Sequence, residues 1–204
     1  MIPFCLLIGL FLFSFPAVAA DFENALNVDL THPAALQEAN RVLAEELKLA
    51  SRPQTYILVD LVAPAVLLKG RGVELHRFHI ASWSAESLEA MASTFRLVAR
   101  PPVARRKIDP SAAKDQDPIS LADMPHRFRL TCTPPLWIDV GPADHSWYQV
   151  ERRISLWWRQ LRQWALAQPS EPELHLALAG DQAQSFAWAL LDDMPLVIRR
   201  PADK

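Results

Sequence analysis

The sequence has little cysteine, little glycine and little net charge. Its 204 residues include two cysteines and five glycines against seventeen prolines, and the formal net charge is -2. Cys5 lies in an apolar run at the N-terminus, so the rest of the chain holds Cys132 alone and forms no internal disulfide. The small net charge argues against a general nucleic-acid binder. We predict neither a cofactor nor a metal, because no complete ligand spacing is present.

The first 20 residues have the pattern of a signal peptide. Residues 2–16 are almost wholly apolar, and small residues at Ala17 and Ala19, or at Ala20, precede Asp21. This pattern predicts export to the periplasm or secretion after cleavage. The apolar run is shorter than the about 20 residues that a membrane helix needs. An uncleaved N-terminal anchor remains the alternative, because no lysine or arginine precedes the run.

After residue 20 we expect an N-terminal helical segment over 21–54 and one globular domain over 55–204. Thr31 and Pro33 have the residue types that begin a helix, and Pro53 ends it. Apolar residues recur between them at helical spacing. The domain contains a proline-rich segment, 100–126, that we interpret as a long loop.

The stretch from Thr55 to Ile80 predicts consecutive strands joined by tight turns. Val73 and Leu75 share one face of the third strand, but Phe78 and Ile80 share the other, which predicts a bulge or a strand that crosses between environments. Further strands and helices follow, including a helix over 147–167 rich in tryptophan. We therefore predict an α+β fold, with a mainly antiparallel sheet, an N-terminal helix and the long tryptophan-rich helix packed on the sheet.

Two stretches of the chain resemble the L,D-transpeptidase catalytic-domain family. The first is Tyr56–Leu61 with the glycine turn at Gly70 and Gly72. The second is the C-terminal part, and it comprises residues 180–183, 186–191 and 194–198. In that family a cysteine thiolate, activated by an upstream histidine, attacks a peptide carbonyl.

The family's serine-histidine-glycine-cysteine motif is absent from this chain. The segment where the nucleophile would precede the closing helix is Glu173–Ala179, which contains His175 but neither cysteine nor glycine. The resemblance therefore implies an exported, catalytically silent domain. Its expected partners are cell-wall peptidoglycan or an envelope protein.

The tryptophan-rich helix allows three interpretations. Its apolar stripe is typical of a core helix that covers a sheet, which we favour. Tryptophan with arginine is also typical of an interfacial helix at a membrane surface, where the protein would act as an assembly factor, and of a partner-binding surface. The candidate binding residues are Trp147, Arg152, Trp157 and Trp158 of this helix, with Arg105 and Arg106 of the loop.

Other polar residues define a competing hypothesis, a periplasmic hydrolase. Asp60 and Asp139 lie in predicted strands and could act as acid and base if they shared a cleft with His126. His145 completes this set of candidate polar residues. A strand-edge aspartate that bonds to backbone is the simpler interpretation of Asp60.

Two further features have simple structural interpretations. Cys132 has no charged neighbour in the sequence that would favour a thiolate, so a buried thiol is expected. His76 and His79 lie three apart on a strand and should point to opposite faces, which argues against a metal pair.

Overall fold

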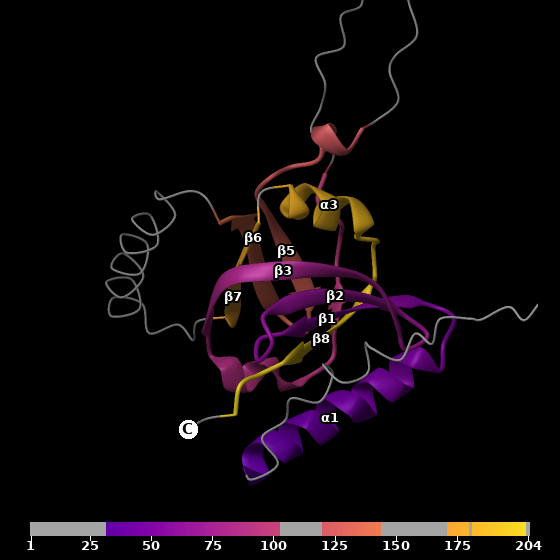
Figure 1. Ribbon diagram of the computed structural model, residues 1–204, viewed down its shortest axis with the longest axis vertical. Coiled ribbons are helices and arrows are strands. Elements are labelled where there is room, and N and C mark those ends of the chain that lie inside the picture. The colour runs from indigo at the N-terminus through magenta and orange to yellow at the C-terminus, as the bar shows by residue number, and fades with distance from the viewer. Residues whose placement is uncertain (1–31, 103–119, 144–170, 180, 203–204) are drawn as a thin grey trace, which may run out of the picture.

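The computed structural model describes residues 32–102, 120–143, 171–179 and 181–202. These residues form eight strands that close into a barrel, with two α-helices packed on it (Figure 1). The strands are β1 (Thr55–Asp60), β2 (Ala65–Gly70), β3 (Val73–Glu86), β4 (Phe95–Leu97), β5 (Phe128–Thr133), β6 (Leu136–Pro142), β7 (Glu173–Leu178) and β8 (Pro195–Arg199). The helices are α1 (Pro33–Ala50) and α3 (Gln182–Ala189), with short 3₁₀ turns at Leu88–Ala92 and Leu121–Asp123.

The strand order around the barrel is β1-β2-β3-β7-β6-β5-β4-β8. Two of the eight neighbouring pairs are parallel, β8 with β1 and β6 with β7, and the others are antiparallel. The parallel pair of β1 and β8 brings the first strand against the last one and closes the ring. Closure leaves every strand with two neighbours, which removes the exposed sheet edges.

The β2–β3 hairpin matches the predicted turn and bulge. Its two loop residues, Arg71 and Gly72, have φ of 51° and 82°, as a tight hairpin with the right-handed twist requires. The β2–β3 register then shifts between Leu68 and Lys69, and Leu75 is the extra residue on β3. The predicted change of face along this strand is thereby confirmed, since Phe78 and Ile80 are buried while Leu75 is exposed.

The main hydrophobic core fills the inside of the barrel. Alternate residues of the strands point inward, as in Ile57 and Val59 of β1 or Ile138 and Val140 of β6. Helix α3 lies over one end of the barrel (Figure 1) and adds Phe186 to the same core. The inside of the barrel is therefore filled by packed side chains.

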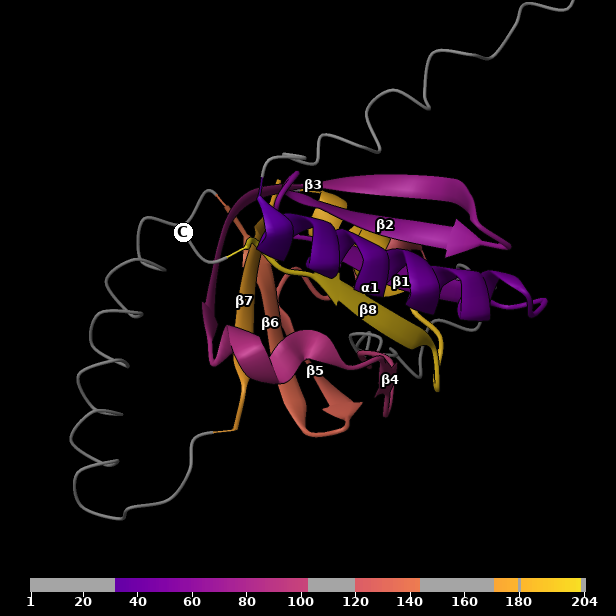
Figure 2. The same cartoon turned by 90° about the horizontal axis from the view of Figure 1, so that it is seen from below.

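A second, smaller core lies between α1 and the outside of the barrel. Val42 and Leu49 of α1 pack with Tyr56, Leu58 and other outward residues of β1, β2 and β8. Figure 2 shows α1 running along the outside of these strands. This contact explains why the apolar run in β1 is continuous, because both faces of the strand are covered.

The predicted α+β fold with a long helix packed on its sheet is wrong, because the sheet is a closed barrel. The closure depends on the pairing of β1 with β8, which are far apart in sequence. The helix that shields β1 is α1. The tryptophan-rich segment 147–167, which the sequence predicts to pack on the sheet, lies outside the described residues.

The predicted N-terminal helix is present as α1, and a second helix, α3, follows β7. Neither is long and apolar enough to cross a membrane.

Candidate functional site

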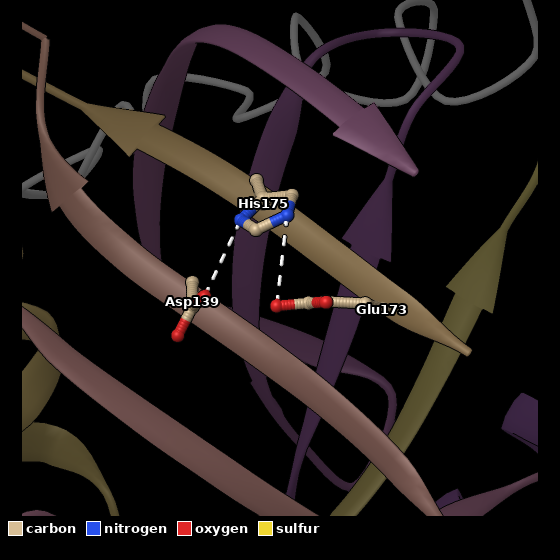
Figure 3. Close-up of side chains that lie close together, drawn as sticks. All are labelled: Asp139, Glu173 and His175. Atoms are coloured by element: carbon tan, nitrogen blue, oxygen red, sulfur yellow. Dashed lines mark ion pairs between the residues drawn. The ribbon is translucent and has the colours of Figure 1, made fainter. Parts of the chain in front are cut away.

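A cluster of charged side chains lies on the outer face of β5, β6 and β7. Ile138 and Val140 point into the core, so Asp139 between them points outward. The register places Arg129 of β5 opposite Asp139, and Asp139 opposite His175 of β7. Glu173 lies two residues from His175, on the same face of β7. Figure 3 shows Asp139, Glu173 and His175 directed toward one another.

Arg129 binds both carboxylates of this cluster. Its Nε donates to Asp139 Oδ1 at 2.6 Å, and its Nη2 donates to Asp139 Oδ2 at 2.7 Å. The same Nη2 donates to Glu173 Oε1 at 3.2 Å. The guanidinium also lies over the ring of Trp137, 5.3 Å from its centroid. The bidentate contact with Asp139 is the stronger kind of ion pair, because two parallel hydrogen bonds fix its geometry.

The imidazole of His175 lies between the two carboxylates. Its Nδ1 is 3.4 Å from Asp139 Oδ2, and its Nε2 is 3.7 Å from Glu173 Oε1 (Figure 3). The side chain of Glu173 is only 4% exposed. One ring nitrogen of His175 and one carboxylate oxygen from each of Asp139 and Glu173 lie within 4.8 Å of one another. An imidazole beside two carboxylates can exchange protons or share a cation.

The surroundings of Asp139 favour its charged form. Burial raises the pKa of this carboxyl, but hydrogen bonds with His175 and Arg129 outweigh burial and lower the pKa well below its usual range. The charged form of Asp139 is therefore bound more tightly in the folded chain than in the unfolded one.

We expect Asp139→Asn to lower the free energy of unfolding at neutral pH by about 1–2 kcal/mol, because it weakens the pair with the half-exposed Arg129. The pKa of Asp139 is depressed on folding, so its stabilisation is complete above the unfolded value near 3.8 and decreases as the pH falls below it. Urea unfolding of both proteins at several pH values measures this. A difference that grows toward acid pH would contradict the prediction.

The structure does not bring Asp60 and Asp139 together. Asp60 lies at the end of β1, where it accepts a hydrogen bond from Arg199 at 2.9 Å and from the backbone N–H groups of Val62 and Ala63. Strands β1 and β6 are opposite each other in the closed strand order. Asp60 therefore binds backbone N–H groups at the end of its strand, which agrees with its simpler interpretation. His126 is exposed just before β5.

The other seven candidate residues belong to segments that the structure does not describe. Residues 103–119 and 144–170 lie outside the described part of the chain. This applies to Trp147, Arg152, Trp157, Trp158, Arg105, Arg106 and His145.

Cys132 is buried in the main core, 3% exposed. Burial raises the pKa of its thiol from 9.0 to about 12. The thiolate, which is the nucleophilic form, is therefore a minor species at neutral pH. This agrees with the buried thiol that the sequence predicts.

We expect Cys132 to be unreactive in the folded protein. In a Cys5→Ser variant, where Cys132 is the sole cysteine, a pKa raised from 9.0 to about 12 reduces the thiolate fraction about a thousandfold, and burial blocks access as well. A chromogenic disulfide reagent should react fully in denaturant and hardly at all without it. Rapid reaction of the folded protein would contradict the prediction.

Sequence reasoning missed the grouping of Glu173 and His175 with Asp139. The available signal was the alternation in β7, where two polar residues, Glu173 and His175, interrupt an otherwise apolar strand. Their partners belong to β5 and β6, and the parallel β6–β7 register that joins them cannot be read from one sequence.

Comparison with protein-family models, with curated proteins and with solved structures finds no match to this chain. The fold and the site together define a helix-covered, closed eight-stranded β-barrel with a carboxylate–histidine–arginine cluster on its outer face.

Proposed function

We propose that this chain is an exported, non-catalytic domain that resembles an L,D-transpeptidase and binds cell-wall peptidoglycan. One observation carries the non-catalytic part of the proposal. The segment in which the family has its nucleophile is here β7, a strand whose outward polar residues, Glu173 and His175, contact Arg129 and Asp139. No thiol is part of this contact network.

The buried thiol supports the same conclusion. A transpeptidase nucleophile must be an accessible thiolate beside a base. Cys132 is enclosed in the barrel, and its pKa is about 12. Binding without bond cleavage is the function that remains consistent with an export signal and this resemblance.

The hydrolase alternative has less support, because Asp60 and Asp139 lie on opposite sides of the barrel. The membrane-surface alternative depends on residues 147–167, so it rests on their composition alone. The alternative is that the chain binds an envelope protein instead of peptidoglycan. The same experiment distinguishes these two partners.

Sedimentation of the purified protein with isolated peptidoglycan sacculi tests the proposal. We expect the protein to sediment with sacculi, and we expect the Arg105→Ala/Arg106→Ala and Trp157→Ala/Trp158→Ala variants to sediment less. Trp188→Ala is the matched control, since Trp188 is an exposed tryptophan of α3 outside the candidate set. A protein that stays in the supernatant while an envelope protein co-purifies with it supports the partner alternative. Absence of both contradicts the proposal.

A further inference from the structure

We propose that Asp139, Glu173 and His175 form a binding site for one divalent transition-metal ion, of which Zn²⁺ is the best fit. This inference does not rest on cell-wall binding, because it depends only on the side-chain cluster of β6 and β7. The three residues supply one imidazole nitrogen and two carboxylate oxygens within 4.8 Å of one another. Nitrogen and oxygen ligands in this combination suit zinc.

The position of Arg129 shows where a cation fits. Its Nη2 lies 2.7 Å from Asp139 Oδ2 and 3.2 Å from Glu173 Oε1, so a positively charged group already lies between the two carboxylates. Zinc binds such oxygens at about 2.0–2.2 Å. An ion at the position of Nη2 would therefore need Asp139 Oδ2 about 0.6 Å closer and Glu173 Oε1 about 1.1 Å closer.

The strands hold the ligands in place before the ion binds. Asp139 and His175 are register partners on neighbouring parallel strands, and Glu173 is fixed on the same strand as His175. Inward neighbours such as Ile138 and Leu174 are buried in the main core, which limits movement of the backbone. Pre-positioned ligands reduce the entropy lost on binding.

Arg129 is the most exposed member of the cluster. Its side chain is 48% exposed, while those of Asp139 and Glu173 are 19% and 4% exposed. The guanidinium can therefore turn into solvent and leave the carboxylates behind. In the metal-bound state one ring nitrogen of His175 would coordinate the ion, and the other would keep its proton.

Competition with a chromophoric zinc chelator, using the purified metal-free protein and Zn²⁺ alone, tests the inference. We expect one ion per chain. His175→Ala and Asp139→Asn should each weaken binding by at least about tenfold. Arg129→Ala should tighten binding severalfold, because it removes the competing cation. His79→Ala is the control for surface histidines and should leave the affinity unchanged, since His79 is exposed on β3.

X-ray absorption at the zinc edge gives a second measurement that needs no variant. It should show one imidazole nitrogen at about 2.0–2.1 Å together with carboxylate oxygens. Three outcomes overturn the inference: no zinc uptake, uptake that His175→Ala and Asp139→Asn leave unchanged, or weaker binding in Arg129→Ala. If the protein binds zinc at this site but does not sediment with sacculi, only the proposed function is refuted.

Discussion

Replacing Glu38 with glutamine is expected to lower the free energy of unfolding by about 3–5 kcal/mol, the usual cost of breaking a buried ion pair on one side. Glu38 lies on α1 and is 8% exposed. Its carboxylate accepts hydrogen bonds from Arg41 at 2.6 Å and from Arg200, after β8, at 2.7 Å. Glutamine has no charge, so the two guanidinium groups would lose their shared counterion.

The contacts of these arginines extend the expected effect beyond α1. Arg41 also donates to the backbone carbonyls of Ala92 and Ile198. Arg200 donates to the carbonyl of Leu88 at 3.3 Å. Glu38 therefore joins α1 to the 3₁₀ turn at Leu88–Ala92 and to the end of β8, and its loss loosens three elements together.

The same carboxylate gives a pH dependence. Burial raises the pKa of Glu38, but hydrogen bonds from Arg41 and Arg200 outweigh it and lower the pKa from 4.5 to about 2. The resulting stabilisation, roughly 3 kcal/mol, is complete above pH 4.5 and is lost as the pH falls toward 2. The difference between the wild type and Glu38→Gln should therefore shrink over this range.

Chemical denaturation at several pH values measures both effects. The matched control is Glu74→Gln, which breaks the exposed pair with Arg77 and should cost less than about 1 kcal/mol. Equal losses in the two variants would show that the contacts around Glu38 add little stability. A pH-independent loss would show that charge is not the cause.

The positions of the strands could be predicted from the sequence, but their closure could not. Local signals are enough for β1, β2 and β3, because apolar alternation and the Gly70–Gly72 turn lie within one short stretch. The contacts that close the barrel join Ile57 to Leu196 and Trp137 to Glu173. These pairings depend on long-range register, which local periodicity does not encode.

The candidate site shows the same limit. The sequence indicates Asp139 only as a strand carboxylate that could act with Asp60 as acid and base. Its partners could not be named, because Arg129 and His175 reach it only through cross-strand register. Asp60 raised the same question, and its partner Arg199 likewise comes from the distant strand β8. A sequence thus identifies a buried charge more readily than it identifies what neutralises that charge.

Phe186→Ala is expected to lower the free energy of unfolding by about 3–5 kcal/mol, the usual cost of removing a large buried aromatic side chain. Phe186 is 2% exposed, and α3 directs it into the end of the barrel. Its ring centroid lies 5.2 Å from that of Phe78 on β3 and 6.1 Å from that of Phe128 on β5. Truncation would leave a cavity that three rigid elements surround and cannot readily fill.

Trp188→Ala on the same helix separates packing from helix propensity. Trp188 is 50% exposed, so its removal should change stability by less than about 1 kcal/mol. Thermal and urea unfolding of both variants measure the contrast, and Phe186→Leu should recover most of the loss because it refills the cavity. Equal stability of the two alanine variants would contradict the prediction. It would show that the buried face of α3 contributes no more to stability than its exposed face.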